Sequence, residues 1–312
     1  MPSRGWMLIL VLLMVSMTAC TAAKVMRQLN EYEITLASTS PVDTTKTDVT
    51  ATTDANGKPA QLLSAFFGLD NGFPGISDQA ICEGAGGKDG MPVIFSHEVD
   101  LSTMQAGDFK VTTASGQVGK LLCVTLAPAD DAGELRTVLL VGEYGSKDDP
   151  PATVEVVGNL LSIDGSVNFK GASVKAIPLQ DGPTMILAQT LPKERLALGK
   201  KATALPWGGG SGCPVGTRQV VNVTWVGGVT KPGGDEVDDV ERQLYKVTVE
   251  QADGSQIQAT PFALGDLGDG DNNHRLCLDV EGAPKSVSFP GGHMTDPNED
   301  LNPDTSIDVT QP

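Results

Sequence analysis

The segment Asp108-Phe-Lys-Val-Thr112 recurs 136 residues later, with small changes, as Leu244-Tyr-Lys-Val-Thr248. Each copy is followed by a short glycine-containing turn, Ala-Ser-Gly116 in the first and Ala-Asp-Gly254 in the second. Aromatic and β-branched residues favour strands, and glycine favours the tight turn between two strands. Both copies therefore predict a β-strand that enters a hairpin.

The same pattern continues through most of the chain. Short runs rich in β-branched residues, separated by Gly, Asp, Asn and Pro, predict further strands at 91–95, 121–126, 137–141, 153–157, 220–225 and 286–289. The amphipathic helices that βαβ crossovers require are missing from the pattern. The sequence therefore predicts an all-β protein built from antiparallel β-sandwiches.

The order of the matching segments indicates an internal repeat. Asp130 and Arg136 are six residues apart, as are Asp269 and Arg275, and each arginine is followed by an apolar strand. We therefore predict two tandem sandwich domains, 61–192 and 213–312, joined by a Gly-rich linker at 193–212. The alternative is a chance agreement between two all-β stretches.

The cysteines favour export from the cytoplasm. Apart from Cys20 there are four, Cys82, Cys123, Cys213 and Cys277, with no Cys-x-x-Cys spacing. Four cysteines allow three pairings in an oxidising compartment. If each repeat is self-contained, the pairs are Cys82–Cys123 and Cys213–Cys277.

The N-terminus has the features of an export signal. An apolar run at 6–15 is shorter than the roughly 20 residues that span a bilayer and fits a signal peptide. Met17-Thr-Ala-Cys20 resembles the lipobox of bacterial lipoproteins. The resemblance implies cleavage of 1–19, acylation of Cys20 and, because Thr21 is not Asp, the outer membrane. The alternative is an ordinary signal peptide with Cys20 incidental. The Thr/Ser/Asp-rich composition predicts a flexible tether over 20–60.

The first copy also resembles bacterial Ig-like modules of the S-layer type. Phe95-Ser96, Val99-Asp100, Thr103 and Phe109-Lys-Val111 match the opening pattern of these modules over roughly residues 85–175. The resemblance implies two Ig-like domains with a spacer, adhesive or envelope-structure role.

Calcium is the candidate cofactor, since two loops place oxygen ligands at alternating positions. The first loop is Asp266-Leu-Gly-Asp-Gly-Asp-Asn-Asn273, and the second carries Asp296, Asn298, Asp300 and Asp304. Neither is an EF-hand, and Asp and Asn also favour turns for their own sake. The longer second loop is the preferred calcium site.

The net charge and the catalytic motifs that the sequence lacks narrow the classes of function to consider. The 39 acidic against 22 basic residues give a net charge of −17, which disfavours nucleic-acid binding. No Gly-x-Ser-x-Gly or Walker loop occurs, and His97 is expected in a solvated loop. We therefore expect no enzyme but a lipid-anchored envelope module with a structural or binding role and a protein or glycan partner. The alternatives are a hydrolase with its site between the domains and an accessory subunit of a surface or export complex.

Overall fold

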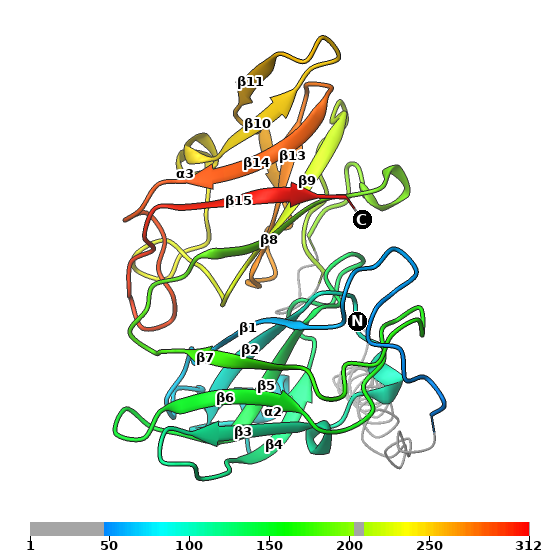
Figure 1. Ribbon diagram of the computed structural model, residues 1–312. Helices are drawn as coiled ribbons and strands as arrows, with labels where there is room; N and C mark the ends of the chain where they lie inside the picture. Colours follow the sequence, from blue (N-terminus) through cyan, green and yellow to red (C-terminus); the bar gives the residue numbers. More distant parts are fainter. Residues whose placement is uncertain (1–46, 203–208, 312) are drawn as a thin grey trace, which may run out of the picture. The chain divides into compact units, whose positions relative to one another are not determined.

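The computed structural model describes residues 47–202 and 209–311, and in them the chain is all-β (Figure 1). The expected all-β class is thereby confirmed. Cys20 and the expected signal peptide lie outside the described residues. None of the helices in the described part is both long and apolar enough to cross a bilayer.

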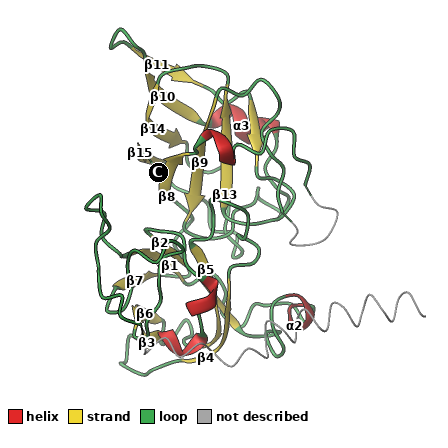
Figure 2. Cartoon of the chain, turned by 90° about the vertical axis from the view of Figure 1, so that its right-hand side faces the viewer, coloured by secondary structure: helices red, strands yellow, loops and turns green. Residues whose placement is uncertain are grey.

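Two sheets contain all of the named strands. The first sheet contains β1 (Leu62–Phe66), β2 (Asp89–Phe95), β3 (Phe109–Thr113), β4 (Lys120–Thr125), β5 (Thr137–Glu143), β6 (Pro151–Val156) and β7 (Ser173–Ile177). The second contains β8 (Met185–Thr190), β9 (Gln219–Trp225), β10 (Lys246–Glu250), β11 (Gln256–Ala259), β12 (Ala263–Gly265), β13 (Asn273–Leu278), β14 (Ala283–Phe289) and β15 (Thr305–Thr310). The α-helices α2 (Ser77–Ala80) and α3 (Asp239–Leu244) are single short turns between strands (Figure 2).

The two sheets have the same strand order. The first runs β3-β6-β7-β1-β2-β5-β4, and the second runs β10-β14-β15-β8-β9-β13-β12 with β11 added outside β10. In each sheet one pair is parallel, β1 with β7 and β8 with β15, while the other pairs are antiparallel. The two matching segments that open the sequence analysis occupy the equivalent strands β3 and β10. The topology therefore agrees with the internal repeat.

Each sheet curls around its own apolar core. The first core takes Met91 and Phe95 from β2 and Val111 from β3, all fully buried. The second takes Trp225 from β9 and Val247 from β10, also fully buried. Along β3 and β10 burial alternates from residue to residue, because successive side chains of a strand point to opposite faces. This arrangement is sandwich-like in both halves. We call the half built on β1–β7 the first sandwich and the half built on β8–β15 the second sandwich.

Both expected disulfides are present. Cys82 is joined to Cys123 of β4 with a Cα–Cα distance of 6.7 Å, and Cys213 to Cys277 of β13 with 5.7 Å. Each bond connects segments belonging to one sheet, which confirms the pairing derived from the repeat.

The second sheet begins earlier in the sequence than expected. β8 pairs with β9 and β15, so residues 185–190 belong to the second sheet although they were expected at the end of the first domain. The physical reason is the repeat itself, since β8 occupies the position that β1 holds in the first sheet.

Residues 47–60, expected in the tether, contact the first sandwich. Asn168 Nδ2 donates to the carbonyl of Val49 at 3.0 Å, and Asp54 lies 3.2 Å from His97 Nε2. Buried polar groups need such partners, and this segment supplies them. Residues 47–60 therefore belong to the folded part of the chain, and the rest of the expected tether lies outside the described residues.

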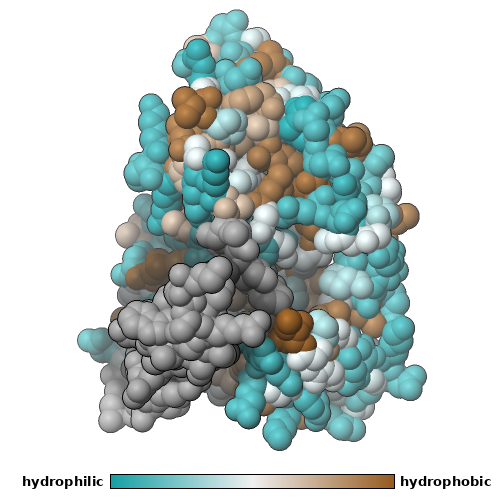
Figure 3. All heavy atoms as spheres, turned by 180° about the vertical axis from the view of Figure 1, so that it is seen from behind, coloured by the Kyte–Doolittle hydropathy of each residue, from teal (hydrophilic) through white to brown (hydrophobic). Residues whose placement is uncertain are grey.

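The surface combines polar side chains with scattered apolar ones. The face seen in Figure 3 is mostly hydrophilic, with hydrophobic residues in its upper part. Apolar side chains that remain exposed include Val215, Val240 and Leu301. Single exposed apolar residues of this kind are normal for a folded protein.

Candidate functional site

The most unusual chemistry of the described chain lies where two loops meet. One loop connects β4 to β5 and carries Asp131 and Glu134; the other connects β12 to β13 and carries Asp266, Asp269 and Asp271. We call these five carboxylates the junction cluster. Four of them are at most 7% exposed, and Asp131 is half-buried. The cluster combines residues from both sheets, about 135 positions apart in sequence.

Three residues of the β12–β13 loop have left-handed backbone conformations, and their residue types tolerate these conformations. Asp266 has φ +66°, and Gly268 and Gly270 have φ +102° and +73°. Glycine adopts this left-handed region freely and Asp tolerates it better than most residues. The loop is tied down by Asp266 N, which donates to the carbonyl of Ser211 at 2.5 Å, and by Gly268 N, which donates to Glu236 at 2.7 Å.

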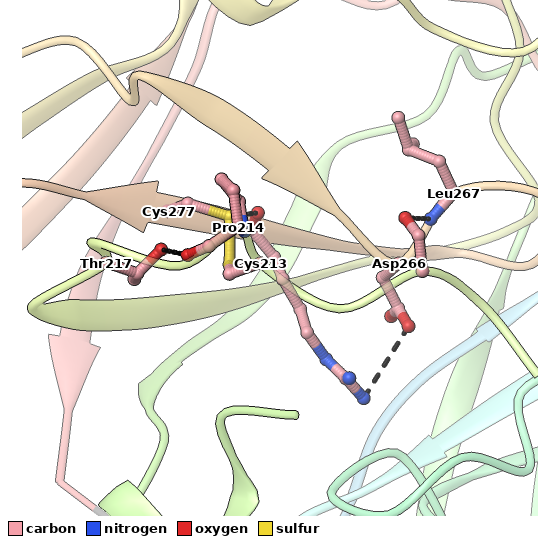
Figure 4. Close-up of a disulfide and its surroundings, with 8 residues drawn as sticks. Cys213, Pro214, Thr217, Asp266, Leu267 and Cys277 are labelled. Atoms are coloured by element: carbon pink, nitrogen blue, oxygen red, sulfur yellow. Dashed lines mark hydrogen bonds and ion pairs between the residues drawn. A yellow bond between two sulfur atoms is a disulfide. The ribbon is translucent and has the colours of Figure 1, made fainter. Parts of the chain in front are cut away.

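One arginine enters the cluster. Arg275 of β13 is 2% exposed; its Nη2 donates to Glu134 Oε1 and to the carbonyl of Ala132 at 3.2 Å. The same nitrogen lies 3.5 Å from Asp266 Oδ1, and a dashed line marks this ion pair at Asp266 in Figure 4. Arg275 therefore links the two loops through one guanidinium group.

Several carboxylate oxygens of the junction cluster have no hydrogen-bond donor. These are Glu134 Oε2 and both oxygens of Asp266 and Asp269. Asp131, Glu134 and Asp266 each present an oxygen within 4.8 Å of the others, the one such group of three in the described residues. Asp271 differs, because both of its oxygens accept hydrogen bonds from Asn273, at 2.8 and 2.7 Å.

Burial and mutual repulsion make these carboxyl groups hard to ionise. Burial raises the pKa of Glu134, and burial together with the charge of Glu134 raises the pKa of Asp266 to about 12. The same two causes raise the pKa of Asp269 to about 6 and that of Asp271 well above its usual range. Desolvation penalises the charged form, and a neighbouring like charge adds to the penalty. Without a cation, the cluster is thus electrostatically unfavourable.

The Gly-rich segment expected as a linker packs against the cluster. Gly210 N donates to Asp131 Oδ2 at 3.0 Å, and Lys200 Nζ contacts the same oxygen at 2.6 Å. A Cβ atom at Gly210 would lie 2.5 Å from Asp269 Oδ2 and 2.9 Å from Asp266 Oδ1. Any larger residue would therefore collide with the two carboxylates, and both oxygens face this one position.

A cavity of about 280 Å³ adjoins the cluster on the side of the second sheet. Its lining includes Thr230, Glu236, Asp266, Asp271 and His274. The cavity therefore lies directly beside Asp266.

The preferred calcium loop has a different organisation from the one expected. Asp296 is 2% exposed, and its Oδ1 accepts hydrogen bonds from the backbone N–H groups of Asn298 at 3.0 Å and Asp300 at 2.9 Å. Asn298 Nδ2 donates to the carbonyl of Gly68 and to Asp296, while Asp304 accepts from Gly291 N. In the described residues Asp296, Asp300 and Asp304 do not form a group of three carboxylates with oxygens close to one another. Calcium binding by this loop stays a prediction. The carboxylates that do converge include those of the first loop.

His97 does not lie in the solvated loop that was expected for it, and His274 is buried. His97 is partly buried, with Nδ1 2.9 Å from Ser96 Oγ and Nε2 3.2 Å from Asp54. His274 is 3% exposed; its Nδ1 lies 2.7 Å from the Tyr245 hydroxyl, which accepts a hydrogen bond from Trp225 Nε1 at 3.0 Å. Burial lowers the pKa of His274 to about 4, so this side chain is neutral at pH 7.

Comparison with known proteins gives limited information. The chain matches no known family and no curated protein. One solved structure with partial similarity is the N-terminal part of the bacterial S-layer protein SbsC, at 14% sequence identity and a TM-score of 0.27; the match covers 80% of this chain and 44% of that chain. Another is the S-layer protein rSbsC(31-844), at 14% sequence identity and a TM-score of 0.28; the match covers 81% of this chain and 26% of that chain. The chain thus spans less than half of each. TM-scores of this size do not define a shared fold.

Sequence reasoning identified part of this site. It singled out the first acidic loop through its alternating carboxylates but ranked it below the second loop, and it missed Asp131 and Glu134. The available signal was the repeated spacing of Asp130 to Arg136 and Asp269 to Arg275. Both arginines are buried in the structure, at 6% and 2% exposure. Arg136 directly precedes β5, and Arg275 lies inside β13.

Proposed function

We propose that this chain is an exported, non-catalytic structural or binding module of the cell envelope, held on the outer membrane by an acylated Cys20. The observation that carries this proposal is the pair of disulfides, one in each sandwich. Reducing systems of the cytosol keep thiols free, so stable disulfides are typical of proteins that fold outside it. The lipobox-like Met17-Thr-Ala-Cys20 supplies the matching export and anchoring signal.

The way the two sandwiches meet supports a structural role over a hydrolase with a site between the domains. Glu134 and Asp266 are 0% and 1% exposed, and Arg275 contacts both. A glycan or peptide chain could not reach these groups without opening the junction. Arg136 adds a second contact, because its guanidinium donates to Gln189 of β8 at 3.1 Å. These contacts suit a rigid pair of modules that presents its outer surface to a protein or glycan partner.

The experiment that tests the anchor is expression of the full chain in a bacterial host with two envelope membranes. Wild type is expected in the outer-membrane fraction, with a mature N-terminus at Cys20 whose mass includes acyl chains. Cys20→Ala should release the protein into the soluble envelope fraction, whereas the matched control Thr21→Ser should stay with the membrane. An unmodified N-terminus in wild type, or membrane retention of Cys20→Ala, would overturn the anchoring proposal.

A further inference from the structure

We propose that the junction cluster binds a calcium ion, with Glu134, Asp266 and Asp269 as ligands and Asp131 completing the set from the first sandwich. This inference does not depend on the function or the anchor proposed above. It rests on how the oxygens of these side chains are placed, on their missing partners and on the local charge.

Unpartnered oxygens point to a ligand. Glu134, Asp266 and Asp269 are each more than nine-tenths buried, yet they leave five oxygens without any hydrogen-bond donor. A buried acceptor without a partner destabilises the folded state, and a charged one does so more strongly. A cation satisfies several such oxygens at once, which a single donor cannot do.

The oxygens face a common space. An oxygen of Glu134 and one of Asp266 lie within 4.8 Å of each other and of one on Asp131. Asp269 Oδ2 and Asp266 Oδ1 both point at Gly210, where a Cβ would lie 2.5 and 2.9 Å away from them. Oxygens that all bind a calcium ion at about 2.3–2.6 Å are separated from one another by roughly twice that distance at most. The spacing of Asp131, Glu134 and Asp266 fits this limit.

The charge balance favours a divalent ion. The five carboxyl groups of the junction cluster face two basic side chains, Arg275 and Lys200, so the acidic groups outnumber the basic ones by three. A doubly charged cation offsets this acidic excess and favours the ionised carboxylates. Buried charges require such pairing, because the low dielectric of the interior provides little other compensation.

The chemistry of the donors favours calcium over other divalent ions. All the donors are oxygens, and no cysteine or histidine belongs to the group of three. Ca²⁺ accepts six to eight oxygens in a flexible geometry, whereas Mg²⁺ requires a near-octahedral site and retains several of its waters. Ligands from two separate loops and a cavity of about 280 Å³ alongside Asp266 fit the more permissive ion.

The consequence is a calcium-dependent junction. Asp131 and Glu134 belong to the loop before β5, and Asp266 and Asp269 to the loop before β13, so one ion would bind both sandwiches. Removing the ion leaves the carboxylates to repel one another across the junction. Calcium therefore fixes the two modules against each other.

Calorimetric titration and thermal unfolding of the full mature chain, stripped with a chelator, test the proposal with Ca²⁺ alone as the probe. We expect one ion per chain and, at a Ca²⁺ concentration 100 times the dissociation constant, a rise in melting temperature of about 5–10 °C. Mg²⁺ at equal ionic strength should produce a much smaller rise. Asp266→Asn and Asp269→Asn should each abolish the rise and, because repulsion is relieved, should fold at least as well as the metal-free wild type.

Asp300→Asn is the matched control, since it removes one carboxylate from the second acidic loop and should leave calcium binding unchanged. Loss of binding in Asp300→Asn, or retention of full binding in Asp266→Asn, would overturn the junction site. Equal responses to Ca²⁺ and Mg²⁺ would overturn it as well, because they would show a non-specific effect of divalent ions. If Asp266→Asn fails to fold, Glu134→Gln gives the same decision by titration.

Discussion

Arg275→Met should be the most destabilising single substitution on the surface where the two sandwiches meet. Arg275 is 2% exposed and is the basic group that contacts both Glu134 and Asp266. Methionine keeps much of the length of the side chain but removes the charge and the hydrogen bond to the carbonyl of Ala132. Removing one partner of a buried ion pair leaves the other charge uncompensated, at a cost of about 3–5 kcal/mol.

The effect is measured by urea unfolding and by thermal unfolding, both in the presence of a chelator, so that bound calcium does not contribute. A loss of this size should lower the melting temperature by roughly 6–20 °C. The matched control is Arg218→Met. Arg218 pairs with Glu281 on the surface, where the two side chains are 55% and 77% exposed, and such pairs contribute about 0–1 kcal/mol.

A double-mutant cycle with Glu134→Gln separates the ion pair from general packing. Gln is neutral and of similar size, so Arg275→Met should cost less in its presence, with a coupling of about 1–3 kcal/mol. A loss below about 1 kcal/mol for Arg275→Met, or effects of the two substitutions that add without coupling, would show that the junction is not held by this pair.

Two further predictions concern the second sandwich. Replacing Cys213 and Cys277 together by alanine opens a loop of 64 residues and should lower the free energy of unfolding by about 4 kcal/mol, as measured by urea titration; an unchanged midpoint would contradict the chain-entropy reasoning. His274 has a folded-state pKa of about 4, below its unfolded value of 6.5, so the unfolded chain takes up the proton first and stability should fall by about 3 kcal/mol between pH 6.5 and 4. In His274→Gln this pH-dependent loss of stability should vanish. A difference in the free energy of unfolding between wild type and variant that does not change with pH would refute the prediction.

The sequence by itself determined the fold class and the disulfide pairing. The residues at 109–113 and 246–250 alternate buried and less buried side chains in the structure, and this period-two pattern is a local property that the chain carries without any tertiary contact. The pairing followed because the repeat assigns Cys82 and Cys123 to one copy and Cys213 and Cys277 to the other.

Tertiary structure decided where the second sheet starts and which acidic residues meet. β8 had no distinctive pattern of its own, and its place became visible only through its pairing with β9 and β15. Asp296 and Asp266 both lie in acidic loops, yet Asp296 accepts hydrogen bonds from its own turn while Asp266 faces Glu134. Glu134 and Asp266 are 132 positions apart, and their approach depends on the packing of two loops from different sheets. Local spacing carries information about turns and strands, whereas the convergence of charges from distant loops exists only after the chain has folded.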